Sequence, residues 1–315
     1  MATSEGSDEA TATPPELRDF ERAQRRLLET TGTEYESQFV ELQRPACRIH
    51  AIDAGDPDVE PPVLLIHGVT GFGAMFAPLL AGLDGRRVIA VDRPGWGLSG
   101  EYTYAPDTHR QTAVEVLSGV LDELGVERVD IVGHSTGGYW GILFALAHPD
   151  RVRRVVLVGG VPSFPGTRPP IPARLFTLSP ISRFVFGRLA TSRDGLVKQM
   201  KSVGERDTII RYPELIQAWV ESYRLRRTPT VACSEYRAFV TLRGWRANRI
   251  HRSELRDLRQ PTAFIWGERD FLGSPSAVRE PIDAMPAASL EVLDAGHIPW
   301  FGHPESRARL VQEPP

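Results

Sequence analysis

The strongest fold signal in this 315-residue chain is the stretch RVDIVGHSTGGYW, residues 128–140. Its first half is short, apolar and β-branched without alternation, as in a strand buried on both faces of a parallel sheet. Gly133-His-Ser135-Thr-Gly137 follows, which matches the pattern G-x-S-x-G, and a helical stretch begins directly after it. A tight strand-to-helix turn at this pattern presents the serine hydroxyl above the sheet. The stretch therefore predicts that Ser135 is a nucleophile.

Similar apolar segments lie on both sides of this stretch. They are VLLIHG (63–68), RRVIAVD (86–92), RRVVLVGG (153–160), TAFIWGERD (262–270) and SLEVLDAGHI (289–298). Helical stretches are expected between or after them, over 74–83, 108–124, 136–148 and 275–285, with a final helix ending near Val311. Strands that alternate with helices of this length indicate right-handed β-α-β units and a parallel sheet.

The N-terminal segment differs in character from this pattern. Residues 1–15 are polar, lack an apolar period and are expected to be a disordered tail. A short amphipathic helix is expected over 15–30, and two strands of a hairpin over YESQFVELQ and ACRIHAIDAG, around Arg44-Pro45.

Residues 161–260 interrupt the alternation of strands and helices. They are rich in proline at first and then indicate irregular helices, without a buried strand. They hold 19 Lys and Arg against 8 Asp and Glu, although the whole chain has a formal net charge of −3. One sheet, formed by 16–160 and 261–315 and interrupted by a helical insertion, is the simplest account. The basic excess could steer an anionic substrate, or it could be a solvated face.

Composition excludes several classes of protein. With 41% hydrophobic and 24% charged residues the chain has the composition of a globular protein, and no stretch approaches the length of a membrane span. Two cysteines and a polar, acidic N-terminus argue against a secreted disulfide framework, so we expect a cytoplasmic protein. No phosphate-binding glycine pattern follows a strand, and the basic insertion lacks the features of a nucleic-acid-binding module.

A serine at its ordinary pKa is a poor nucleophile, so Ser135 requires a base and an acid that orients the base. His297 stands just beyond the last expected strand, and Asp270 stands just beyond the preceding one. The order Ser135, Asp270, His297 is the one expected for a hydrolytic triad on an open α/β sheet. Glu268 and Asp294 are alternatives for the acid.

Acyl transfer also needs two donors for the oxyanion that forms on the carbonyl. The amide of Thr136, directly after the nucleophile, is the first candidate. The glycine-rich turn that follows VLLIHG points to the amide of Val69 as the second. In that turn His67 is expected to stabilise the backbone and not to act as a base.

With these motifs the chain resembles the serine-nucleophile branch of the α/β-hydrolase superfamily that carries a helical cap after the sixth strand. Asp92-Arg-Pro-Gly-Trp-Gly-Leu-Ser99 is similar to a structural loop of that family, and the resemblance covers about residues 35–312. It implies an eight-stranded, mostly parallel sheet with helices on both faces, and residues 161–260 as the cap. It assigns Ser135 as nucleophile, Asp270 as acid, His297 as base, and the amides of Val69 and Thr136 as the oxyanion hole, with no metal or other cofactor.

The expected reaction is hydrolysis of a small-molecule ester, thioester or lactone through an acyl-enzyme. Within the same fold, C–C bond hydrolysis and a cofactor-free perhydrolase or haloperoxidase-like reaction remain alternatives. A non-catalytic receptor on the same scaffold is an alternative of another class. Four aromatic residues are expected to bind substrate, unless they only pack the interior: Trp140, Trp219, Tyr223 and Trp300.

Overall fold

The structure is a computed structural model that describes residues 14–80, 85–177, 181–188 and 190–302. The expected tail over 1–15 therefore lies almost wholly outside the described residues, and so does the final helix expected to end near Val311. Within the described ranges, none of the helices combines the length and the apolar character that a membrane crossing requires.

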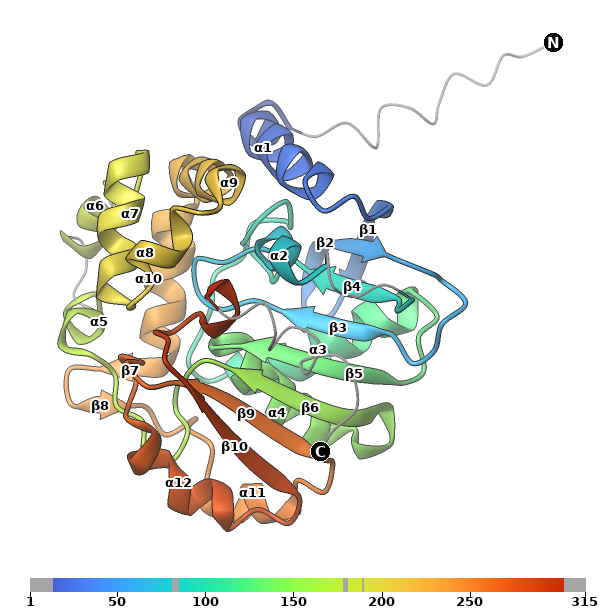
Figure 1. The fold of residues 1–315 in the computed structure, drawn as a ribbon, viewed down its shortest axis with the longest axis vertical. Helices are drawn as coiled ribbons and strands as arrows, with labels where there is room; N and C mark the ends of the chain where they lie inside the picture. Colours follow the sequence, from blue (N-terminus) through green and yellow to red (C-terminus); the bar gives the residue numbers. More distant parts are fainter. Residues whose placement is uncertain (1–13, 81–84, 178–180, 189, 303–315) are drawn as a thin grey trace.

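A single eight-stranded sheet runs through the molecule in the order β1-β2-β4-β3-β5-β6-β9-β10 (Figure 1). Its strands are β1 (Tyr35–Gln43), β2 (Ala46–Ala54), β3 (Val63–Ile66), β4 (Val88–Val91), β5 (Val129–His134), β6 (Val152–Val158), β9 (Thr262–Gly267) and β10 (Ala288–Leu293). Only the pairs β1–β2 and β2–β4 are antiparallel, and the remaining neighbours are parallel. The predicted α/β-hydrolase fold is confirmed.

The central strands β3, β4 and β5 consist wholly of buried residues, which explains their unbroken apolar runs. Helix α4 packs on β3, β5 and β6, helix α3 packs on α4, and α12 packs on β10. The helices outside residues 161–260 are 3₁₀-helix η1 (Pro15–Leu17), α1 (Arg18–Glu29), η2 (Gly73–Phe76), α2 (Ala77–Leu80), α3 (His109–Glu123), α4 (Thr136–Ala147), η3 (Pro149–Arg151), α12 (Pro275–Asp283) and η4 (Pro299–Phe301). Helix α11 (Arg252–Asp257) falls within 161–260 but lies beside α12, to which Arg252 and Glu280 join it.

Residues 161–260 contribute helices that lie beyond the carboxyl ends of the parallel strands (Figure 1). They are α5 (Ile171–Leu175), α6 (Ile181–Phe186), α7 (Arg193–Ser202), α8 (Arg206–Ile209), α9 (Pro213–Arg224) and α10 (Thr228–Phe239). Two short strands, β7 (Val240–Thr241) and β8 (Gly244–Trp245), form a hairpin that the sequence did not predict. Each has only two residues, too few for a periodic pattern to be visible.

Two of the contacts between this inserted segment and the rest of the chain involve long-range packing and a buried ion pair. Helix α1 packs on α9, so the N-terminal helix supports the insertion. In addition, the fully buried Arg93, on the loop after β4, forms an ion pair with the fully buried Glu235 of α10, whose Oε2 also accepts a hydrogen bond from Trp96 Nε1 at 2.9 Å.

The expected helix over 74–83 is split into η2 and the four-residue α2, and residues 81–84 lie outside the described ranges.

Candidate active site

Ser135 occupies the turn between β5 and α4 in a backbone conformation that is rare for a residue with a side chain, with φ 53° and ψ −116°. Such a conformation costs about 1–3 kcal/mol and persists only where the surroundings impose it. Here they do, because a Cβ on Gly137 would lie 1.9 Å from the carbonyl oxygen of Ile66, and one on Gly133 would lie 2.6 Å from that of Gly137. The glycines of the motif allow β3, β5 and α4 to approach this closely.

Asp270 and His297 meet at the carboxyl edge of the sheet. Asp270 Oδ2 lies 2.7 Å from His297 Nδ1, and both side chains are buried. The carboxylate is itself fixed, because Oδ2 accepts the amide of Gly160 at 2.7 Å and Oδ1 accepts that of Leu272 at 2.9 Å. A carboxylate held in this way orients the ring, so that Nδ1 carries the proton and Nε2 is free to accept one.

Ser135 and His297 line the same cavity, together with the two residues expected to supply the oxyanion hole, Val69 and Thr136. The loop that carries Val69 lies against Ser135, since a Cβ on Gly68 would be 2.9 Å from Ser135 Cβ. Thr136 is the first residue of α4, where a backbone amide has no partner within the helix. The arrangement places the hydroxyl of Ser135, the ring of His297 and the backbone at the start of α4 around one small cavity.

His134, the residue before Ser135, links the turn between β5 and α4 to the loop of His297. Its Nε2 lies 3.1 Å from the carbonyl oxygen of His297, and its ring packs on those of His297 and Trp300. Burial, and then the charge of His297, hold the pKa of His134 well below its ordinary value. His134 is therefore neutral, and Nε2 donates to the carbonyl.

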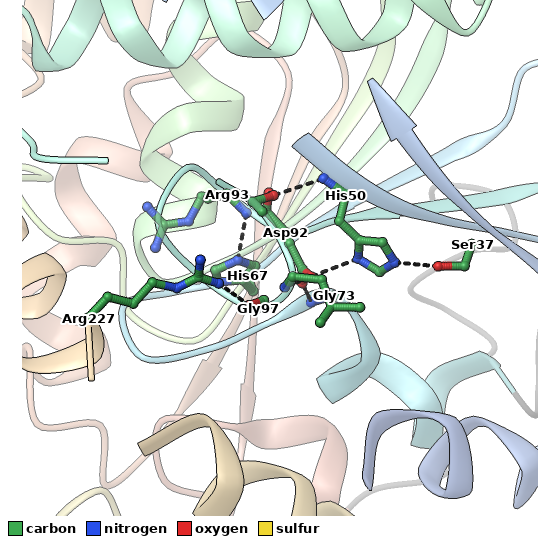
Figure 2. Close-up of polar contacts among 10 residues, drawn as sticks. Ser37, His50, His67, Gly73, Asp92, Arg93, Gly97 and Arg227 are labelled. Atoms are coloured by element: carbon green, nitrogen blue, oxygen red, sulfur yellow. Dashed lines mark hydrogen bonds and ion pairs between the residues drawn. The ribbon is translucent and has the colours of Figure 1, made fainter. Parts of the chain in front are cut away.

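A buried carboxylate, Asp92, organises the loop that carries Val69 (Figure 2). Asp92 Oδ1 accepts the amide of Gly73 at 2.6 Å at the end of that loop. At its start, His67 Nε2 accepts the amide of Arg93 at 2.9 Å, and Nδ1 lies 2.7 Å from the carbonyl oxygen of Gly68. Burial, and then the charge of Arg93, lower the pKa of His67 to about 3, so this ring is neutral and supports the turn.

The carboxylate of Asp92 is also the last member of a second Ser–His–Asp arrangement, a Ser–His–Asp chain of hydrogen bonds (Figure 2). Ser37 Oγ lies 2.7 Å from His50 Nε2, and His50 Nδ1 lies 2.7 Å from Asp92 Oδ2. This serine differs from Ser135 in its setting, because it lies within the edge strand β1 and not in a strand-to-helix turn. It is also absent from the residues that line the cavity of Ser135. The three residues join β1, β2 and the loop after β4.

The cavity beside Ser135 has a volume of about 130 Å³. A cavity of about 150 Å³ is enough for benzene, so this space suits one ring or a short acyl chain. No lysine or arginine is among the described residues that line it, which are Val69, Thr70, His134, Ser135, Thr136, Pro162, Pro170, Ala173, Gln199, Met200, Val203, Trp219, Tyr236, Phe239, Val240, Trp245, Phe271, Leu272, His297 and Ile298.

Of the four aromatic residues expected to bind substrate, Trp219 lines the cavity. Its Nε1 also donates to the carbonyl oxygen of Thr70 at 2.8 Å, which fixes the loop of Val69 to helix α9. The other three are buried outside the cavity wall. Trp140 packs in the interior against Tyr104 and His109, Trp300 stacks on Phe76, and the hydroxyl of Tyr223 accepts a hydrogen bond from Gln199.

Sequence reasoning missed Glu205, which contacts the loop of His297 from the insertion. The alternatives for the acid lie elsewhere: Asp294 is exposed and pairs with Arg269, and Glu268 is exposed. Within the described ranges, no cluster of three or more His, Cys, Asp or Glu side chains could hold a metal ion.

The chain matches a family model and named relatives over most of its length. A family model described as "alpha/beta hydrolase fold" matches residues 61–304. The chain is 31% identical over 274 residues to a 2-hydroxy-6-oxononadienedioate/2-hydroxy-6-oxononatrienedioate hydrolase of Cupriavidus pinatubonensis, and the match covers 84% of this chain and 89% of the relative.

Two solved structures share the fold at low sequence identity. Carboxylesterase CesB from Bacillus subtilis superposes with a TM-score of 0.73 at 22% identity, over 95% of this chain and 97% of that one. The 2-hydroxy-6-oxo-6-phenylhexa-2,4-dienoate hydrolase from a Rhodococcus strain superposes with a TM-score of 0.68 at 22% identity, over 88% and 99%.

Proposed function

The chain belongs to the α/β-hydrolase family, and we propose that it is a serine hydrolase in which Ser135, His297 and Asp270 cleave a bond beside a carbonyl carbon. The observation that carries this proposal is the 2.7 Å contact between Asp270 and His297 on the wall of the cavity that Ser135 also lines. Acyl transfer requires a nucleophile, a correctly oriented base and hydrogen-bond donors for the oxyanion. Ser135, His297 and the amides of Val69 and Thr136 would supply them at one cavity.

In the proposed mechanism, Ser135 Oγ attacks the carbonyl carbon while His297 Nε2 takes the hydroxyl proton. The amides of Val69 and Thr136 donate to the oxygen that becomes negative. His297 then returns the proton to the leaving group, and an acyl group remains on Ser135. A water molecule, deprotonated by His297, releases the acid and restores the serine.

We propose C–C bond hydrolysis of a ketone-bearing dienoate as the leading reaction. The named activity of the relative from Cupriavidus pinatubonensis supports it, since that protein matches over most of its length. Such a bond breaks through the same steps once the 2-hydroxyl group of the dienoate has transferred its proton to C5 and become a second carbonyl group. That carbonyl group, conjugated to the departing carbon, takes up the electron pair of the broken bond before His297 supplies the proton. Ester hydrolysis, the reaction expected from the sequence, thereby becomes the second candidate.

The cavity wall supports a substrate with less charge than a dioate. A carboxylate taken into a water-poor site needs a cation or several hydrogen-bond donors, and the described lining residues include no lysine or arginine. We infer that the part of the substrate that fills this cavity is uncharged and apolar, for example a ring or a short alkyl chain. The same property favours simple esters, which is the specific observation that keeps the second candidate.

We further propose that residues 161–260 act as a cap over Ser135, joined to a catalytic core of 16–160 and 261–315. Support comes from the cavity wall, to which the inserted segment contributes Ala173, Met200 and Trp219. Its excess of positive charge is absent from the described part of that wall, so the cap selects by shape and apolar contact. Steering of an anion would have to act outside the cavity.

The test compares 2-hydroxy-6-oxo-6-phenylhexa-2,4-dienoate, followed by loss of its dienoate absorbance, with p-nitrophenyl butyrate. We expect a kcat/KM for the dienoate at least about tenfold above that for the ester. Ser135→Ala should abolish both activities, and Ser37→Ala, the same substitution in the second Ser–His–Asp chain, should leave both unchanged. Turnover of the ester alone would select the second candidate, and full turnover by Ser135→Ala would refute the serine mechanism.

A further inference from the structure

Three consecutive backbone amides around His297 are held by the inserted segment. Glu205 Oε1 accepts the amide of Gly296 at 2.8 Å and that of Ile298 at 3.2 Å. Between them, the amide of His297 itself donates to the carbonyl oxygen of Val203 at 2.8 Å. The loop that carries the proposed base therefore takes its backbone position from residues 203–205.

The approach of the two segments is close enough to exclude side chains. A Cβ on Gly296 would lie 2.1 Å from the carbonyl oxygen of Val203, and one on Gly204 would lie 2.8 Å from Gly296 Cα. Gly204 also has φ +80°, a conformation that favours glycine. The turn between α7 and α8 is thus shaped to bring Glu205 to the loop of His297.

The carboxylate of Glu205 is buried, and its hydrogen bonds go to the loop of His297 and to Thr208. The residue is 1% exposed, and its second oxygen, Oε2, accepts the hydroxyl of Thr208 one turn along α8. A buried carboxylate is costly unless its oxygens are hydrogen-bonded, and here the acceptors are matched to amides on both sides of His297. Burial raises the pKa of Glu205, while Thr208, the two amides and the charge of His297 act in the opposite direction.

We propose that Glu205 is a positioning residue for His297, and that the insertion supplies part of the active-site framework in addition to covering it. This proposal rests on the proposed function, because it assigns His297 the role of base. Asp270 fixes the ring at Nδ1 from the core, whereas Glu205 and Val203 fix the backbone from the insertion. Together they set the direction in which Nε2 faces Ser135.

The test uses three substitutions that separate reach from charge. Glu205→Gln keeps the length of the side chain and an acceptor oxygen but removes the charge. Glu205→Asp keeps the charge but is one methylene shorter, and Glu205→Ala removes both. Asp207→Asn is the control, because it removes a carboxylate two residues further along the chain, in α8, where the side chain is 88% exposed.

We expect kcat to fall about 10- to 100-fold in Glu205→Asp and Glu205→Ala, with KM within about threefold, since misplacement of a catalytic group affects the chemical step. Glu205→Gln should stay within about fivefold of the wild type in kcat, and so should the control. The rate of Ser135 labelling by a fluorophosphonate, which also needs the base, should follow the same order. Circular dichroism and thermal unfolding identify any variant that fails to fold.

The proposal is overturned if folded Glu205→Asp keeps the kcat and labelling rate of Asp207→Asn, or if Glu205→Gln falls as far as Glu205→Asp. If the alanine variant does not fold, the Gln and Asp variants alone decide between these results. Failure of the proposed function would look different, because Ser135→Ala would then retain turnover. An inactive Ser135→Ala beside unaffected Glu205 variants would overturn only the positioning role.

Discussion

Asp270 Oδ2 bridges His297 Nδ1 and the amide of Gly160, each at 2.7 Å, so one oxygen atom joins the ends of β6 and β9 to the loop after β10. Both contacts require an acceptor at that position. The carboxylate thus determines which nitrogen of the imidazole carries the proton, and it does so from a point fixed by the sheet itself.

Asp270→Asn should lower kcat by about 10³- to 10⁴-fold with little loss of stability. The amide has one acceptor oxygen where the carboxylate has two, so it cannot accept from His297, Gly160 and Leu272 together. With its NH2 group towards His297, it leaves the ring free to adopt the wrong tautomer. Steady-state kinetics on the wild type and the variant measure the effect. Asp294→Asn is the matched control and should keep full activity, and a comparable loss there would reassign the acid.

Gly137→Ala should cost more than about 4 kcal/mol or prevent folding, because the new Cβ would lie 1.9 Å from a carbonyl oxygen of β3. Gly125→Ala is the informative comparison. Gly125 has φ +67° but nothing within 4 Å of the Cβ position, so its substitution should cost only about 1–2 kcal/mol of backbone strain. Urea unfolding of both variants tests the prediction, and equal losses would contradict it.

In His109→Phe the free energy of unfolding should depend less on pH than in the wild type. Burial, and then the charge of Arg93, lower the pKa of His109 to about 3, and neither ring nitrogen has a partner within the described part of the chain. Below about pH 6.5 the unfolded chain binds a proton that the folded chain refuses, so the free energy of unfolding falls as pH falls towards 3.

For one such histidine the loss at pH 5 is about 2 kcal/mol relative to neutral pH. The phenylalanine ring fits among the neighbouring aromatic rings of Tyr139 and Phe239 and cannot take up a proton. Urea unfolding at pH 7.5 and pH 5 should show a difference smaller by this amount in the variant. An unchanged difference would mean that His109 is not a source of the acid sensitivity.

Glu235→Ala should destabilise the protein by about 3–5 kcal/mol, because it leaves the fully buried Arg93 without its counter-charge. The double variant Arg93→Met/Glu235→Leu should recover much of this loss, since the desolvation of both charges disappears with them. Chemical denaturation of the two variants provides the measurement. If the double variant were no more stable than Glu235→Ala, an unpaired charge would not be the cause.

The sheet and the meeting of Ser135, Asp270 and His297 could be predicted because both depend on local pattern. Parallel strands bring their carboxyl ends to one edge, so residues that follow three strands come together wherever they lie in the sequence. Glu205 could not be found in this way. It lies 91 residues from Gly296 along the chain, and no motif marks a carboxylate that accepts backbone amides. The same holds for Arg93 and Glu235, which are 142 residues apart.

The buried pair of Arg93 and Glu235 also has a consequence for how this protein can be recombined with its relatives. Consider a chimera in which residues 161–260 are replaced by the corresponding segment of another α/β hydrolase. Arg93 and Trp96 Nε1 would then lose the carboxylate of Glu235, unless the new segment supplies a carboxylate at the same point. The inserted segment can therefore be exchanged between proteins only together with the loop after β4. Libraries that vary substrate preference should exchange the two as a unit.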